Sequence, residues 1–113
     1  MQLINAITVS ELADISKKMY EPIVKAVVDI ETREVVIDAE YHSDQELFLL
    51  DRGSNQENLW GINLWPDKYG TDEFVEFDSM INLRPRQNNR SRSVENSEIR
   101  KTIIDIVSEV VNR

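Results

Sequence analysis

Four arginines stand close together in a stretch that contains no acidic residue. Residues 79–94 include Arg84, Arg86, Arg90 and Arg92. A guanidinium group can bind a phosphate or carboxylate through two parallel hydrogen bonds, and the helix expected after this loop would add free amides that favour anions. The sequence therefore predicts a site for a phosphorylated ligand or a short nucleic-acid segment, with these candidate residues: Arg84, Asn89, Arg90, Ser91 and Arg92.

Two other roles for these arginines remain open. They could pair with acids of the same chain, including Glu95 and Glu98, and simply hold the loop in shape. They could also contact an acidic surface of a partner protein. An anion site predicts exposed guanidinium groups without partners, whereas a structural loop predicts guanidinium groups bonded to internal carboxylates or carbonyls.

A second candidate site lies on the predicted sheet just before the loop. In an extended strand, Asp78 and Asn82 would share one face with Arg84, and Asn63 or Trp65 of the neighbouring strand could lie beside them. Such a face could hold a small molecule or a nucleotide, or it could anchor a protein interface through Trp65. The alternative is an ordinary solvated face of an antiparallel sheet.

The sequence contains little that indicates an enzyme. Asp78 could act with Arg90 or with His42, the single histidine, and scattered acids such as Asp29 and Asp38 could converge with Asp78 on a divalent cation, as in a metal-dependent nuclease. No ligand spacing supports that arrangement, and no glycine-rich phosphate loop or cysteine is present. No catalytic residue, metal ligand or cofactor is assigned.

Charge and composition limit the classes of function. The net charge is −8; because residues 79–94 carry +4, the other residues carry −12, which argues against a protein that coats nucleic acid broadly. The 113 residues suit one domain, 1–113, with a single modest core. No apolar run is long enough to cross a membrane, no secretory signal is evident and cysteine is absent, so we expect a soluble cytoplasmic protein.

Hydrophobic periodicity and capping residues indicate the first half of the fold. Thr8 and Glu11 form a capping box that opens a helix ending near Tyr20, and residues 1–7 could form an edge strand. The β-branched runs 25–30 and 34–39 predict a hairpin. A second capping box from Ser43 to Glu46 predicts a short helix through Leu50, with Gly53 as its left-handed terminator.

The second half repeats this plan. Residues 59–65 form a predicted strand with Trp60 facing the core, and the alternation over 74–83 predicts a fourth strand. Asn96 then caps a helix from Ser97 to about Asn112. The expected fold is an α+β two-layer domain in which about four mainly antiparallel strands are covered on one face by about three helices, in the order α-β-β-α-β-β-α.

Three segments resemble the small prokaryotic domain-of-unknown-function family DUF5674. They are Leu59–Asn63, Phe77–Pro85 and Asn89–Ser93. The resemblance extends over essentially the whole chain and implies a soluble prokaryotic protein, with no activity or cofactor attached. It also implies a glycine where this chain has Asn88. Asparagine is the best substitute for glycine at a left-handed position, so we expect Asn88 to keep that backbone shape.

Three hypotheses follow from these features. The first is a non-enzymatic binding module with an anion site in the arginine loop before the last helix. The alternatives are a protein-interaction subunit or homodimer, and a metal-dependent enzyme such as a nuclease. The expected partner is a phosphorylated ligand or a protein, and the sequence does not specify which ligand or which protein.

Overall fold

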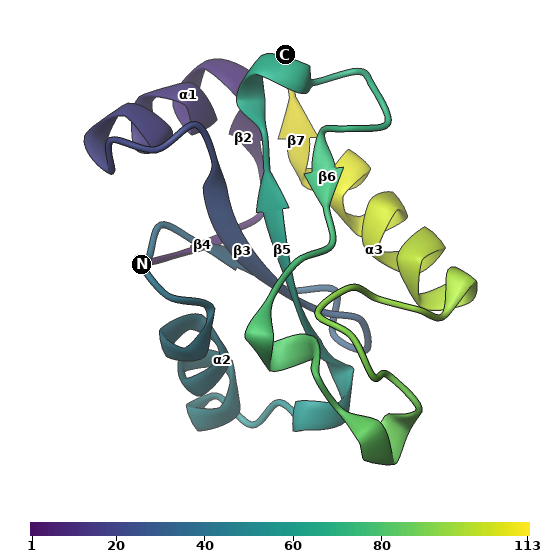
Figure 1. The fold of residues 1–113 in the computed structure, drawn as a ribbon. Coiled ribbons are helices and arrows are strands. Elements are labelled where there is room, and N and C mark those ends of the chain that lie inside the picture. The colour runs from purple at the N-terminus through teal and green to yellow at the C-terminus, as the bar shows by residue number, and fades with distance from the viewer.

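A computed structural model describes residues 1–113 and contains three α-helices, a five-stranded sheet and a separate pair of short strands (Figure 1). The helices are α1 (Val9–Lys18), α2 (His42–Asp51) and α3 (Ser97–Val110). The sheet is ordered β1 (Gln2–Ile4), β4 (Val35–Ile37), β3 (Val24–Asp29), β5 (Leu59–Leu64) and β6 (Val75–Glu76), and its neighbours are all antiparallel. The predicted α+β class and mainly antiparallel sheet are confirmed.

The second strand pair joins the two ends of the described chain. β2 (Ile7–Thr8) runs parallel to β7 (Val111–Asn112), with Ile7 opposite Val111. Both of these residues are buried in the main core. The last predicted helix therefore ends two residues early, because its final residues pair as a strand. No helix here has the length and apolar character that crossing a membrane requires.

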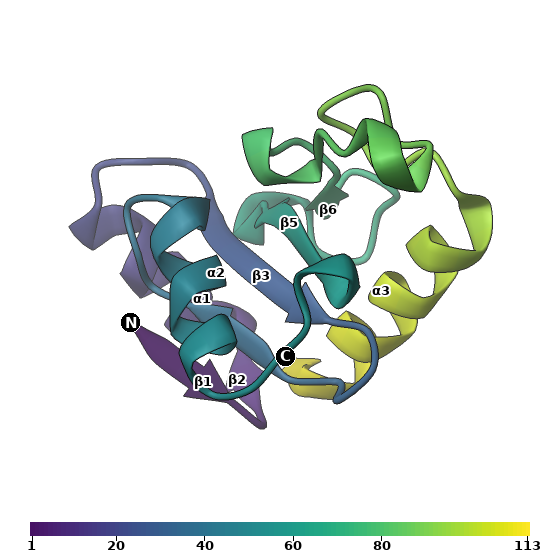
Figure 2. The same ribbon diagram turned by 90° about the horizontal axis from the view of Figure 1, so that it is seen from below.

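The helices cover both faces of the sheet. Side chains of α1 and α3 pack with Ala26, Val28 and Ile62 in the main core, whereas Leu49 of α2 packs with Val27 and Leu59 on the opposite face. Figure 2 shows α2 and α3 on opposite sides of β3 and β5. The expectation that three helices cover one face was wrong, because nearly every residue of β3 and all of β5 are buried and both faces need a cover.

Capping chemistry explains most helix boundaries. The Thr8–Glu11 capping box is present, and the Asn96 side chain accepts from the amides of Glu98 and Ile99. Gly53 has a φ of 102°, as expected of a residue that terminates a helix. The predicted Ser43 cap was wrong: α2 begins at His42, and its N-cap residue Tyr41 makes no side-chain capping bond. The first amides of α2 therefore lack a side-chain partner.

The predicted strand over 74–83 was also wrong beyond its start. β6 ends at Glu76, and the chain continues through 3-10 turns at Met80–Asn82 and Pro85–Gln87. The Ser79 hydroxyl accepts from the amide of Ile81, and this local bond starts the first turn. As a result Ile81 packs on the α2 side of the sheet, whereas Phe77 packs against the main core.

Side chains replace a neighbouring strand along part of β5. The Asn82 side chain accepts from the amide of Gly61 at 2.9 Å and donates to the carbonyl of Gly61 at 2.9 Å. This exchange satisfies both backbone groups that a paired strand would have satisfied. A Cβ added at Gly61 would lie 2.6 Å from the Cβ of Ser79, so the close approach requires glycine here.

Replacing Gly61 with alanine is expected to destabilise the protein by about 1–3 kcal/mol, because the new methyl group overlaps Ser79 in a packed interior. Urea unfolding of the Gly61→Ala variant measures this loss. In a Ser79→Gly background the added loss should shrink by more than about 0.5 kcal/mol, as expected of residues in contact. Equal losses in both backgrounds would contradict the contact.

Candidate functional site

Arg84, the first candidate of the arginine loop (residues 79–94), points into the protein. It is 9% exposed, and its guanidinium group stacks on the ring of Trp60 with 4.5 Å from Cζ to the ring centroid. Burial lowers its pKa, an effect that the nearby Glu46 carboxylate opposes. The group donates to internal acceptors throughout: the carbonyls of Ile81, Gln56 and Leu59 and the Gln87 side chain.

Asn89 holds the loop together from its centre. Its side-chain amide donates to the carbonyls of Asn82 and Ser93 at 2.7 Å each, and its side-chain oxygen accepts from the amide of Glu95. The backbones of Arg84 and Asn89 also bond to each other in both directions. Asn88 has a φ of 60°, which confirms the left-handed position expected for it. The loop is therefore a closed, internally bonded unit.

Arg90 and Arg92 point outward but differ in their surroundings. The guanidinium of Arg92 contacts the Asp78 carboxylate at 2.6 Å, in an ion pair that is about half exposed on both sides. Arg90 is exposed, and its guanidinium makes no hydrogen bond or ion pair. Glu95, one of the acids expected to pair with the arginines, instead accepts from the backbone amide of Arg90, and this hydrogen bond lowers the pKa of the Glu95 carboxyl.

A polar groove opens beside the loop, and its lining includes residues from the start of α2 and from the segment after β6. It measures about 490 Å³, within the range of small-molecule sites. Its polar lining comes from β3, α2, β5, β6 and the arginine loop, and its wall also includes Ile23, Met80 and Ile81. The polar lining residues are Lys25, Tyr41, His42, Ser43, Asn63, Glu76, Asp78, Ser79 and Arg92.

The polar groove contains positive groups that the protein leaves without a negative partner. Lys25 takes part in none of the four ion pairs of the structure, so no carboxylate lies within ion-pair distance of it. The uncapped start of α2, at Tyr41 to Ser43, lines the same groove and adds the positive end of the helix dipole. Arg92 is held at the wall by Asp78. An anion could therefore be held from several sides.

The groove also contains a buried acceptor without a donor. Asn63 is 6% exposed, and its amide nitrogen donates to Glu76 at 2.8 Å and to the Asp78 carbonyl at 3.4 Å. Those two acceptors determine which end of the amide is nitrogen. The side-chain oxygen of Asn63 is buried and has no hydrogen-bond partner. Buried polar atoms normally have partners, so this oxygen is an acceptor that the protein itself leaves unsatisfied.

His42 is a buried residue of the polar groove. Its Nε2 lies 2.8 Å from the carbonyl of Ile62 and, as the donor, leaves Nδ1 as an acceptor. Burial lowers the pKa of His42; Lys25 and Arg92 lower it further, while the bond to Ile62 and the Asp78 charge oppose the shift. The ring is therefore neutral at pH 7.

The structure brings together some predicted site residues and separates others. Asn63, Asp78 and Arg92 meet in the polar groove, and Ser91 and Arg90 lie outside its lining. Asn82 was expected on an exposed sheet face but is buried against Gly61. Trp65 is half-buried, donates to Glu76 at 3.3 Å and lies under Lys68.

Lys25 and the start of α2 were missed as parts of a site. The available signal was a single lysine followed by the apolar run 26–28 within a buried strand. His42 and Asp78, named together for the enzyme hypothesis, do share the groove. However, His, Asp and Glu side chains form no group of three or more that could hold a metal ion, so the acids named for a nuclease do not converge.

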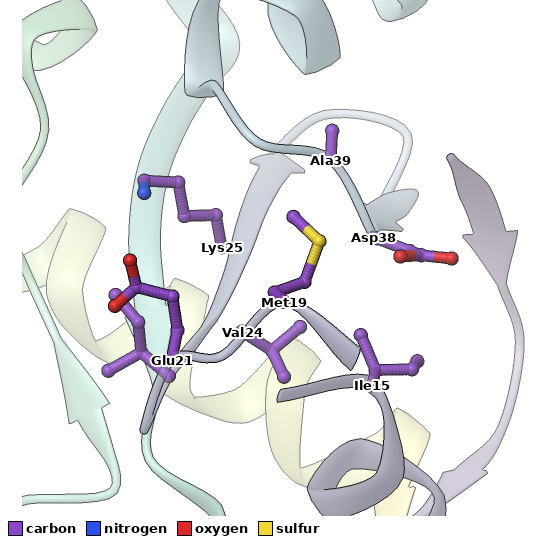
Figure 3. A pocket seen from close by; sticks show the side chains of 8 residues that line it. Ile15, Met19, Glu21, Val24, Lys25, Asp38 and Ala39 are labelled. Atoms are coloured by element: carbon purple, nitrogen blue, oxygen red, sulfur yellow. The ribbon is translucent and has the colours of Figure 1, made fainter. Parts of the chain in front are cut away.

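A second, smaller cavity lies between α1 and β3 (Figure 3). Ile15, Met19 and Val24 form its apolar side, with Glu21 and Lys25 on one side and Asp38 on the other. Its volume of about 20 Å³ has room for about one water molecule and for no larger ligand. This small pocket is therefore not a candidate ligand site.

Comparison with known sequences places the chain in a family. Residues 2–110 match the family described as Protein of unknown function (DUF5674). The chain belongs to the DUF5674 family. No curated protein and no solved structure matches it. The DUF5674 match covers the polar groove and the arginine loop together, while its description assigns neither of them a role.

Replacing Arg84 with methionine is expected to destabilise the protein by about 3 kcal/mol or more, because several buried carbonyls lose their donor. The Arg86→Met variant is the matched control. Arg86 is exposed and makes no side-chain hydrogen bond, so its loss should stay within about 0.5 kcal/mol. Thermal or urea unfolding compares the two variants. Similar small losses in both would contradict the internal role of Arg84.

Stability should fall as the pH drops below about 6.5, the ordinary histidine pKa. The pKa of His42 is lowered in the folded protein, so below pH 6.5 the unfolded chain binds a proton at His42 more readily than the folded protein does. This difference in proton binding favours unfolding as the pH falls. Stability from this source is therefore complete above pH 6.5. His42 is the only histidine, so unfolding of His42→Gln from pH 7.5 to 5 should show a flatter decline than the parent protein. If the stability of both proteins declined in parallel, His42 would not be the cause of the pH dependence.

Proposed function

We propose that this DUF5674 protein is a non-enzymatic binding module whose polar groove holds a small phosphorylated molecule that also carries a hydroxyl or amino group. The most direct support is that this one groove contains both positive groups without an anion and a buried acceptor without a donor. Lys25 and the uncapped start of α2 lack an anion, while the buried oxygen of Asn63 lacks a donor. A phosphate beside a hydroxyl would meet both needs.

The electrostatics favour a ligand with a single anionic group. Asp78 is ion-paired with Arg92, and Glu76 accepts hydrogen bonds from the neutral side chains of Asn63 and Trp65. Lys25 is therefore the cation of the lining that has no ion-pair partner. Helix amides and a lysine are ordinary phosphate-binding groups. Because the Arg92–Asp78 pair is about half exposed, Arg92 can exchange part of its contact with Asp78 for a phosphate at small cost.

A protein-interaction role is the second candidate, and two exposed side chains favour it. Tyr41 and Met80 line the polar groove while remaining 57% and 63% exposed. Tyrosine and methionine are common in protein interfaces. A peptide that ends in an acidic residue could place that residue against Lys25. Its apolar side chains would then lie across Tyr41 and Met80.

The test is a thermal-shift panel of sugar phosphates and nucleoside monophosphates, each beside its dephosphorylated counterpart. A ligand of the folded state raises the midpoint, so phosphorylated members should shift it and their counterparts should not. For a hit, the Lys25→Met and Arg92→Gln variants should each weaken binding by roughly tenfold, the loss typical of one charge-assisted contact.

Arg90→Gln is the matched control, because Arg90 lies two residues from Arg92 and outside the groove lining. Its affinity should equal that of the parent protein. A hit lost in Arg90→Gln and retained in Lys25→Met would place the anion on the outer side of the loop. A panel without any shift would contradict the phosphate assignment, and binding of acidic peptides would then favour the interaction role.

A further inference from the structure

A second groove lies on the other side of the sheet, against α3. It measures about 560 Å³ and separates α3 from the segment 69–77. Its floor includes the buried side chains of Phe74 and Val107, and Ile104 at its rim is 47% exposed. We call it the α3 groove. It shares no lining residue with the polar groove.

Aromatic rings line one side of the α3 groove in a fixed arrangement. Tyr69 and Phe74 meet edge to face, with ring centroids 5.0 Å apart and planes at 86°. The Tyr69 hydroxyl donates to the Val111 carbonyl at 3.4 Å, which ties the ring to β7. Phe77 completes the aromatic lining. A flat apolar body would find ring edges and faces here without any rearrangement.

Two arginines flank these rings, and no carboxylate lies within ion-pair distance of either. Arg100 lies over the Phe77 ring at 4.6 Å, and Arg113 lies over the Tyr69 ring at 5.1 Å. Arg100 is further positioned by bonds to the Val94 carbonyl and the Ser93 hydroxyl. Stacking occupies the faces of a guanidinium group and leaves N–H donors at its edges for an anion.

The charge of the α3 groove is opposite to that of the protein. Among side chains, its lining contains the cations of Arg100 and Arg113 and a single carboxylate, that of Asp72, on a protein with a net charge of −8. An acidic protein that keeps two unpaired arginines beside an apolar floor is complementary to an anion with an apolar body.

We propose that the α3 groove binds a small aromatic acid: a molecule with a flat apolar body and one carboxylate, phosphate or sulfonate group. The body lies against Phe74, Phe77 and Ile104, and the acid group reaches the edges of Arg100 and Arg113. This site is separate from the polar groove and does not depend on the function proposed for it.

The probe for this test is 8-anilinonaphthalene-1-sulfonate, an aromatic sulfonate that fluoresces on entering an apolar site. It should bind the folded protein at one site. Its neutral analogue N-phenyl-1-naphthylamine, which lacks the sulfonate, should bind more weakly. The Arg113→Gln variant should weaken sulfonate binding by roughly tenfold, the loss of one charge-assisted contact, and leave the neutral probe unaffected.

Two helix variants test the apolar part of the site. Ile104→Glu places a carboxylate at the rim and should weaken sulfonate binding by at least roughly tenfold through repulsion and lost apolar contact. Leu47→Glu is its matched control, because Leu47 is a similarly exposed residue of α2 outside the α3 groove. Circular dichroism checks that every variant is folded.

The proposal is overturned if the folded protein fails to bind the sulfonate probe. Equal losses in Ile104→Glu and Leu47→Glu, or unchanged sulfonate affinity in Arg113→Gln, would also overturn it, because the probe would then bind elsewhere or without the arginine. Loss confined to Arg113→Gln and Ile104→Glu supports the site.

Discussion

The closure of β5 by side chains is the constraint on which the rest of the structure depends. β6 pairs only with the last two residues of β5, so both backbone groups of Gly61 and the carbonyl of Leu59 would otherwise be buried without partners. Asn82 bonds to the amide and the carbonyl of Gly61, and Arg84 donates to the carbonyl of Leu59. Because an unpaired buried backbone group costs as much as a lost hydrogen bond, these contacts hold the arginine loop against the sheet. They also place Asp78 and Arg92 at the wall of the polar groove.

The same residue type serves different purposes within one short loop. Arg84 is an internal donor stacked on Trp60, Arg92 is a half-exposed partner of Asp78, and Arg90 is free. The positive charge counted along the sequence is therefore larger than the charge available to a ligand. The anion-attracting groups shift from the loop itself to the adjoining groove, where Lys25 and the start of α2 contribute.

Capping residues and hydrophobic spacing along the sequence predicted the helices. Contacts between residues far apart in the sequence determined the parts of the structure that were not predicted. Thr8, Glu11 and Asn96 act within one helical turn, so their roles could be predicted from spacing. Asn82 looked like an exposed residue of an alternating strand, because its partner Gly61 lies 21 residues away. The isolated glycine in β5 was the available sign of a close approach. Asn63 and Asp78 could be paired from neighbouring strands. Lys25 joins them because β3 pairs with β5 and places Lys25 opposite Asn63, whereas His42 joins them through the packing of α2.

The pairing of β2 with β7 has a consequence for synthesis of the protein. Ile7 contacts Val111 across almost the whole sequence, and both belong to the main core together with α1 and α3. Contacts so distant in sequence carry a large loop-closure cost and slow folding. On the ribosome, β2 stays without its neighbour until residues 111–112 have emerged. The part of the core around Ile7 therefore stays incomplete until residues 111–112 are available.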